Sequence, residues 1–166
     1  MIIEGTALKY GNNIDTDVII PGKYTKTLDM RELAAHVLED LDPGFRRRLT
    51  PGGFLVAGCN FGCGSSREQA PLALKHAGVG CVVAKSFARI FYRNAINIGL
   101  PLVECDTEDI VDGDPLRYDA GEGTLCNLRT GATVRVRPLP QIMVEILTKG
   151  GLIGFLKASG GYRELP

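Results

Sequence analysis

The chain has 166 residues and balances 19 basic against 19 acidic side chains, so its formal net charge is zero. It therefore lacks the positive excess with which a protein binds nucleic acid or an anionic membrane surface. The sequence contains no apolar run of the roughly 20 residues that a transmembrane helix needs, and its first residues do not have the pattern of a signal peptide. We expect a cytoplasmic protein with no nucleic-acid or membrane partner, and the length predicts a single domain over residues 1–166.

The first quarter of the chain predicts a strand, a loop and a helix. Residues 2–10 alternate enough to form a strand. Residues 14–20 pass from polar to apolar without a helical period, which indicates an ordered loop entering a short extended segment. Residues 22–28 are polar and are expected to be exposed. Residues 30–41 place their apolar side chains on one face, which predicts a helix with Asp29 as its N-cap.

The middle third alternates buried strands with helices. The predicted elements are strands at 54–57, 79–84 and 100–104, a helix that begins near 67–70 and ends near 76, and a helix at 87–98. This alternation is typical of a parallel α/β core. The C-terminal third has glycines between short strands at 115–118, 124–129 and 132–137, which predicts an antiparallel meander, followed by helices at 141–149 and 152–157. The predicted fold class is α/β, with a parallel core and a strand-rich C-terminal third.

The segment Gly58–Glu68 is the part of the sequence most suggestive of chemistry. A buried strand ends in a glycine-rich loop, and Ser65, Ser66 and Arg67 follow as a helix begins. Unpaired backbone N–H groups at a helix N-terminus bind anions, and an arginine adds a two-pronged donor that suits a carboxylate. From these residues alone, an anion-binding site and an ordinary polar helix cap are both open.

Familiar motifs do not fit this segment. A dinucleotide-binding fingerprint needs a third glycine where Arg67 stands, a phosphate-binding loop needs a Lys followed by Ser or Thr, and the hydrolase elbow needs a glycine where Glu68 stands. The chain has five cysteines and two histidines without the spacing of metal ligands. We therefore predict no metal site within this chain.

Four stretches, taken in order, resemble one known family. They are Asn13-Ile14-Asp15-Thr16-Asp17 with Ile20-Pro21, then Asn60 to Pro71 (NFGCGSSREQAP), then Lys85 to Asn97 (KSFARIFYRNAIN), then Gly150-Gly151-Leu152. Together they resemble the aconitase-type hydro-lyases, above all the stand-alone small subunits of 3-isopropylmalate dehydratase and homoaconitase. The resemblance extends over nearly the whole chain. It implies a swivelling β/β/α domain, in agreement with the predicted elements.

The resemblance also implies roles for individual residues. Ser65 corresponds to the catalytic base, which removes a proton from the carbon next to the departing hydroxyl. Asp17 corresponds to a member of the supporting catalytic network. Arg67, together with Ser66 and Gly64, corresponds to the group that binds a substrate carboxylate. A serine is a poor base in water, so this role requires the anion-stabilising loop inferred above.

The same resemblance implies a two-subunit enzyme. In the family, a 4Fe-4S cluster acts as Lewis acid and is held by a large subunit, with which this chain is expected to form a heterodimer or heterotetramer. The chain is far too short to contain the cluster domains of full-length aconitases, and Gln69 stands where those enzymes have a histidine. Both departures favour the split dehydratases and argue against citrate as the substrate.

The loop Tyr24-Thr25-Lys26-Thr27 corresponds to the region that contacts the variable group of the hydroxy-acid substrate. A basic side chain in the site favours an extra carboxylate, as in homoaconitase, whereas apolar contacts favour an alkyl group. We expect Lys26 to point away from Ser65 and Arg67, which favours 3-isopropylmalate as the substrate. The isomerisation of this compound is a step of leucine biosynthesis. The alternatives are a homoaconitase, a 2,3-dimethylmalate or citraconate hydratase, and a carboxylate-binding module without enzymatic activity.

Overall fold

The computed structural model of the chain describes residues 1–160. Its centre is a seven-stranded sheet with the order β4-β3-β2-β1-β5-β6-β7. The strands are β1 (Ile2–Lys9), β2 (Phe54–Ala57), β3 (Cys81–Ala84), β4 (Leu102–Glu104), β5 (Pro115–Asp119), β6 (Thr124–Asn127) and β7 (Thr133–Arg135). The strands from β4 to β1 are parallel and those from β5 to β7 are antiparallel to their neighbours. The predicted α/β core and antiparallel meander are both confirmed.

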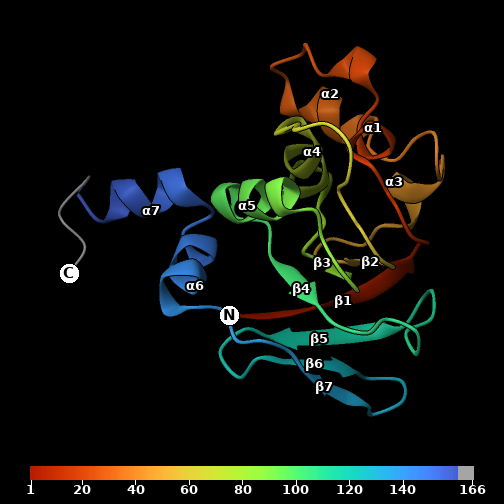
Figure 1. Cartoon of the computed structure of the whole chain (residues 1–166), viewed down its shortest axis with the longest axis vertical. Helices are drawn as coiled ribbons and strands as arrows, with labels where there is room; N and C mark the ends of the chain where they lie inside the picture. The colour runs from red at the N-terminus through yellow and green to blue at the C-terminus, as the bar shows by residue number, and fades with distance from the viewer. Residues whose placement is uncertain (161–166) are drawn as a thin grey trace.

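Strand β1 joins the two halves of the sheet. Its C-terminal end runs parallel to β2, with Ala7 opposite Phe54, and its N-terminal part runs antiparallel to β5, with Ile3 opposite Tyr118. In Figure 1 the antiparallel strands lie below β1, while the helical segments within residues 16–77 gather above it. One continuous sheet therefore connects the parallel core to the C-terminal strands.

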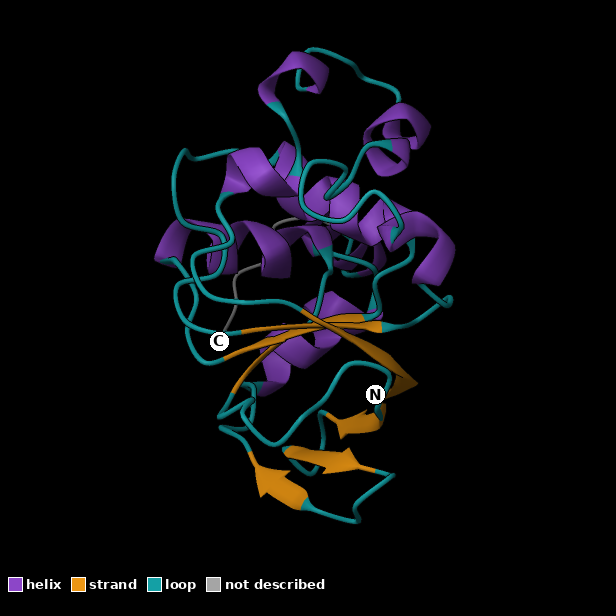
Figure 2. Cartoon of the chain, turned by 90° about the vertical axis from the view of Figure 1, so that its right-hand side faces the viewer, coloured by secondary structure: helices purple, strands orange, loops and turns teal. Residues whose placement is uncertain are grey.

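The sheet curls, so that both faces of its parallel half are covered. Successive side chains of a strand point to opposite faces. Leu55 and Val82 lie in the core that packs against the helices, whereas Phe54 and Val83 lie in a second core with Tyr118 of the antiparallel half. Figure 2 shows the strands crossing beneath the helical layer. Burial on both faces explains why β2 and β3 are uninterrupted apolar runs.

Helices cover one face of the parallel half of the sheet. The helices that the structure describes are α1 (Thr16–Ile19), α2 (Met30–Ala35), α3 (Phe45–Arg48), α4 (Gln69–Ala77), α5 (Arg89–Ile98), α6 (Gln141–Thr148) and α7 (Leu152–Ala158), with a 3-10 turn η1 at Gly22–Tyr24. Helices α4 and α5 each end at a glycine in the left-handed region, Gly78 and Gly99, and Gly99 closes its helix as predicted. None of the helices within residues 1–160 has the length and apolar character to cross a membrane.

Two of the predicted elements differ from the structure. The helix predicted over residues 30–41 ends at Ala35, because Leu38 has a φ of +55° and donates its N–H to the Ile19 carbonyl at 2.9 Å. The loop predicted over residues 14–20 contains α1 instead, because the Asp15 carboxylate accepts hydrogen bonds from the N–H groups of Asp17 and Val18 and caps a single helical turn. Asp29 caps α2 as predicted.

Candidate active site

Three segments meet beyond the carboxyl end of β2: helix α1, the turn η1 with the residues after it, and the segment 58–68. The Ile14 carbonyl accepts a hydrogen bond from the Gly62 N–H at 2.7 Å, and the Thr16 N–H donates to the Cys63 carbonyl at 2.8 Å. The Thr16 hydroxyl donates to the Ser65 carbonyl at 2.9 Å, and Thr16 itself is only 2% exposed. Helix α1 therefore fixes the backbone of the loop that bears Ser65.

Arg67 and Asp17 are brought into contact. Asp17 Oδ1 lies 2.6 Å from Arg67 Nη1, with 25% of the Arg67 side chain and 57% of the Asp17 side chain exposed. Nη1 is buried, and within residues 1–160 it has no hydrogen bond of good geometry, so the contact is mainly electrostatic. The carboxylate thus orients the guanidinium while leaving donors free for a ligand carboxylate.

Gly22 lies directly against the Arg67 guanidinium. A Cβ added at Gly22 would approach Nη1 to 3.2 Å and Nη2 to 3.4 Å, so the start of η1 lies close beside the guanidinium. The guanidinium is therefore enclosed by Asp17 on one side and by η1 on another. A side chain at Gly22 would require the guanidinium to shift by a few tenths of an ångström.

The residues just before α4 form an open row of donors. Ser65 and Ser66 are exposed, and α4 begins at Gln69, within the predicted range. The backbone N–H groups from Gly64 to Glu68 donate no hydrogen bond to any residue that the structure describes. Gly64 has a φ of +91°, which is readily accessible only to glycine and turns the chain at this point. Free N–H groups, two hydroxyls and a guanidinium form a surface suited to an anion.

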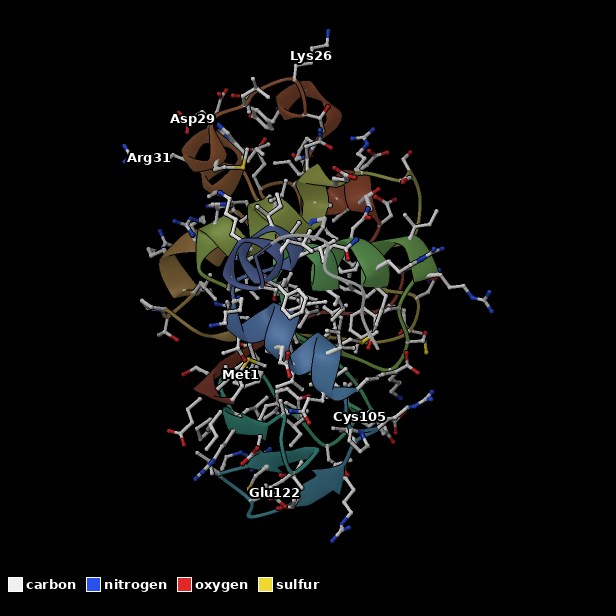
Figure 3. The ribbon with its side chains drawn as sticks, turned by 90° about the vertical axis from the view of Figure 1, so that its left-hand side faces the viewer. Met1, Lys26, Asp29, Arg31, Cys105 and Glu122 are labelled. Atoms are coloured by element: carbon white, nitrogen blue, oxygen red, sulfur yellow. The ribbon has the colours of Figure 1, made fainter. Side chains whose placement is uncertain are left out.

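The loop 22–27, which we call the specificity loop, is attached to its surroundings by several contacts. The Tyr24 ring stacks on His36 at a centroid distance of 3.8 Å, and the Thr25 carbonyl accepts a hydrogen bond from Gln69 Nε2 at 3.3 Å. The Thr27 hydroxyl donates to Glu32 at 2.6 Å. Lys26 is exposed, and Figure 3 shows its side chain extending outward from the end of the molecule.

The cysteines of this chain do not fit an iron–sulfur cluster. Among residues 1–160, no three His, Cys, Asp or Glu side chains are placed to hold a metal ion. Burial raises the pKa of the Cys81 thiol and brings that of Cys105 to about 11, and burial with the nearby Asp15 charge raises that of Cys63. Thiols with raised pKa values are poor ligands, because a metal binds the thiolate.

Three residues that position the site were missed from the sequence. Thr16 bonds to the Ser65 backbone, Gly22 borders Arg67, and Gln69 bonds to the specificity loop. Thr16 carried a signal, since it lies between two carboxylates in a stretch that matched the family. Gln69 also lies in a stretch that matched the family, and Gly22 directly follows another, but their contacts could not be predicted, because they are made with residues more than forty positions away.

Comparison with known proteins shows to which family the chain is related. Residues 45–107, which include the segment 58–68 and α5, match the family model of the aconitase C-terminal domain. The chain is 56% identical to the 3-isopropylmalate dehydratase small subunit of Caldicellulosiruptor bescii, over 95% of this chain and 96% of that protein. It is 54% identical to the small subunit 2 of the same enzyme from Archaeoglobus fulgidus, over 96% of this chain and 98% of that protein. The chain belongs to the family of 3-isopropylmalate dehydratase small subunits.

The fold supports membership of this family. A crystal structure of 3-isopropylmalate dehydratase from Methanocaldococcus jannaschii superposes with a TM-score of 0.91 and 46% identity, covering 96% of each chain. The predicted fold class is thereby confirmed. The family consists of hydro-lyase subunits, and a small subunit implies a large-subunit partner.

Proposed function

We propose that the chain is the substrate-binding subunit of a hydro-lyase that isomerises 3-isopropylmalate by dehydration and rehydration. It acts together with a large subunit. The observation that carries the proposal is the contact of Arg67 with Asp17 beside the open donors of residues 64–68, in a chain of this family. The 4Fe-4S cluster is assigned to the large subunit, since the residues of this chain do not fit it. The assembly is a heterodimer or a heterotetramer.

Ser65 is proposed as the general base. Its hydroxyl is exposed, and deprotonation would place a negative charge on Oγ next to a run of free backbone N–H groups. Donors arranged in advance around a developing charge stabilise it without the cost of reorganising water. The resulting alkoxide would accept the proton from the carbon adjacent to the one that loses its hydroxyl.

Arg67 is proposed to hold a carboxylate shared by every substrate of the family. Asp17 limits the rotation of the guanidinium, and the N–H groups of Gly64 and Ser66, with the Ser66 hydroxyl, add donors on the same segment. Asp17 therefore acts through Arg67, and the carboxylate is gripped in a defined orientation relative to Ser65. Such positioning lowers the entropic part of the activation barrier.

The specificity loop supports an alkyl-substituted substrate. Lys23 Nζ lies 3.3 Å from Glu39 Oε1 and 4.8 Å from the centre of the Tyr24 ring, so its charge already interacts with a carboxylate and an aromatic ring. Lys26 extends outward from the molecule. An extra carboxylate in a desolvated pocket needs an opposing charge, and neither lysine of the loop offers one. Tyr24 and the methyl groups of Thr25 and Thr27 are left to contact an isopropyl group.

Reconstitution tests the proposal. The chain is co-purified with its large subunit, and the complex is assayed without oxygen against 3-isopropylmalate, homocitrate, citraconate and 2,3-dimethylmalate. Turnover of isopropylmalate well above the other three is expected, and light scattering of the complex distinguishes a heterodimer from a heterotetramer. Preference for homocitrate would overturn the assignment of the substrate. Binding of carboxylates without turnover of any of the four would favour a non-enzymatic binding module.

Lys26→Ala provides a sharper test of the substrate class. Because Lys26 extends outward, its loss is expected to leave kcat/KM for isopropylmalate within a few-fold of the unaltered complex. Lys157→Ala, an exposed lysine on α7, serves as the control for a general charge effect. A large loss of activity in the Lys26 variant alone would mean that the ammonium reaches the substrate, and would favour a tricarboxylate.

A further inference from the structure

The specificity loop has few hydrogen bonds of its own. Within it, the Thr25 N–H donates to the Gly22 carbonyl at 3.2 Å and the Thr27 N–H donates to the Tyr24 carbonyl at 3.3 Å, and the only regular element is the short turn η1. A segment with so few internal bonds takes its position from contacts with its neighbours. Two of these contacts are made by His36 and Gln69, which lie outside the loop.

The first contact is the stack of Tyr24 on His36. The two rings are nearly parallel, at 5°, with a centroid distance of 3.8 Å. His36 directly follows α2, and the chain there is held by the bond from the Leu38 N–H to the Ile19 carbonyl, which joins it to the end of α1. His36 thus presents a fixed surface on which Tyr24 rests.

The stack is reinforced by Glu39. Its carboxylate lies 2.7 Å from His36 Nδ1 and 3.3 Å from Lys23 Nζ. Desolvation alone would raise the pKa of Glu39, but its interactions with neighbouring side chains, His36 foremost, outweigh desolvation and keep the pKa below its usual value. The ionised carboxylate therefore connects His36 to Lys23 of the loop.

The second contact comes from Gln69, the first residue of α4. Its side-chain amide donates to the Thr25 carbonyl at 3.3 Å. Arg67 lies two residues earlier in the chain and itself borders Gly22 at the start of the loop. The loop is thus connected to the segment that bears the proposed base and the carboxylate-binding group.

We propose that His36 and Gln69 are positioning residues that hold the specificity loop at a set distance from Ser65 and Arg67, and so determine which substituent the site accepts. The inference rests on the proposed function, because it takes loop 22–27 as the surface that meets the variable group of the substrate. Neither residue needs to touch the substrate. Each acts through the loop, His36 through the Tyr24 ring and Gln69 through the Thr25 carbonyl.

Kinetics of the reconstituted complex provide the first test. His36→Ala removes the stack and Gln69→Glu replaces the donor by an acceptor facing a carbonyl. Each is expected to raise KM for isopropylmalate roughly three- to tenfold, as loss of one aromatic or hydrogen-bonded contact does, while kcat changes less than twofold. His36→Phe retains an aromatic ring and is expected to restore KM. The matched control is His76→Ala, the other histidine, which is exposed on α4.

Trypsin cleavage of the isolated chain provides a second test that requires no activity. Lys26 is exposed within the loop, so cleavage after it reports how often the loop opens. His36→Ala and Gln69→Glu are expected to accelerate cleavage there by more than threefold, whereas His36→Phe and His76→Ala are not. Circular dichroism verifies that each variant is folded.

The outcomes separate this inference from the proposed function. Unaltered cleavage and unaltered KM in both His36→Ala and Gln69→Glu would overturn the inference even if the complex is active. Equal loss of kcat and kcat/KM in these variants would also overturn it, because the residues would then act on the chemical step. Faster cleavage of the loop in these variants, in a protein whose complex does not use isopropylmalate, would support the positioning role of His36 and Gln69. It would contradict the assignment of the substrate.

Discussion

Ser65 combines exposure with an environment suited to negative charge. Its hydroxyl makes no hydrogen bond with any residue from 1 to 160, while its carbonyl is held by the buried Thr16 hydroxyl. The backbone is therefore fixed while the reactive atom stays accessible. Arg67 is likewise held in place by its neighbours, since its guanidinium is oriented by Asp17 and bordered by Gly22.

Replacing Ser65 by Ala is expected to lower kcat of the reconstituted complex by at least about a hundredfold, the range for loss of a general base. Affinity for the large subunit is expected to be unchanged, because a surface hydroxyl contributes little to packing. The measurement is anaerobic turnover of isopropylmalate alongside a pull-down of the two subunits, with Ser159→Ala as the control. Near-normal turnover in the Ser65 variant would mean that another group is the base.

Asp114 shows how one buried charge couples stability to pH. Its side chain is 1% exposed and accepts hydrogen bonds from Asn127 Nδ2 at 2.6 Å and from the Val111 N–H at 2.9 Å, and it pairs with Arg129. The Arg129 hydrogen bond is the main cause that lowers the pKa of Asp114 to about 2. These bonds join the start of β5 to the end of β6.

A lowered pKa makes the folded state bind fewer protons than the unfolded chain. Asp114 is expected to contribute roughly 2 kcal/mol to the free energy of unfolding. This contribution is complete above the ordinary carboxyl pKa near 4 and is lost as the pH falls toward 2. Urea unfolding of the native chain and of Asp114→Asn, between pH 7 and pH 2.5, measures this. The gap in unfolding free energy should narrow at acidic pH; a gap independent of pH would contradict the assignment.

At the level of elements, glycines determine how closely the segment 58–68 packs on α5. Gly62 has a φ of +76°, and a Cβ there would lie 2.2 Å from the Phe91 ring. Phe61, the residue before it, also stacks edge-on against Phe91, with 5.2 Å between the ring centres. The loop before α4 is therefore held against the first turns of α5, and through it the donors of residues 64–68 keep their place.

Gly62→Ala and Gly78→Ala form a matched pair. Both glycines have positive φ, but a Cβ at Gly78 would meet no atom within 4 Å. Gly78→Ala is expected to cost about 1–2 kcal/mol of unfolding free energy, from backbone strain alone. Gly62→Ala adds a clash with a buried ring and is expected to cost at least about 3 kcal/mol. Urea denaturation compares the two variants. Equal losses of unfolding free energy would show that the loop accommodates the Cβ at Gly62 without an energetic penalty.

At the scale of the whole molecule, the specificity loop lies at one end, and the exposed Ser65 and Ser66 leave the site open to a partner. The specificity loop, marked by Lys26, and the β5–β6 turn, marked by Glu122, occupy opposite ends in Figure 3. The exposed serines and the free N–H groups need a second surface to exclude water from the reacting atoms. The large subunit supplies that surface in the proposed assembly, together with the cluster.

The isolated chain is therefore expected to be colourless and inactive after anaerobic purification. Its thiols lie on β3 and β6 and in the segments that follow β2 and β4, and burial raises the pKa of three of them. Activity is expected only when the large subunit is added, with the large subunit alone as the control. A brown chain with the visible absorption of an iron–sulfur cluster would contradict the assignment of the cluster to the partner.

Local patterns in the sequence were enough to predict most of the architecture. Apolar runs bounded by glycine predicted β2 and β3, and Gly99 was predicted to close α5, because burial on both faces and helix termination depend on nearby residues. The four matched stretches, taken together and in order, were enough to predict the family. Ser65 and Arg67 were predicted as site residues in the same way, since both lie within the stretch from Asn60 to Pro71.

Tertiary structure alone decided the features that depend on distant residues. Helix α2 ends early because Leu38 bonds to Ile19, a partner that no periodicity reveals. The outward direction of Lys26 and the closeness of Gly22 to Arg67 follow from how η1 rests on neighbouring segments. A pattern of side chains along a chain encodes which face is apolar and where a helix stops, whereas the meeting of two polar segments depends on the packing of everything between them.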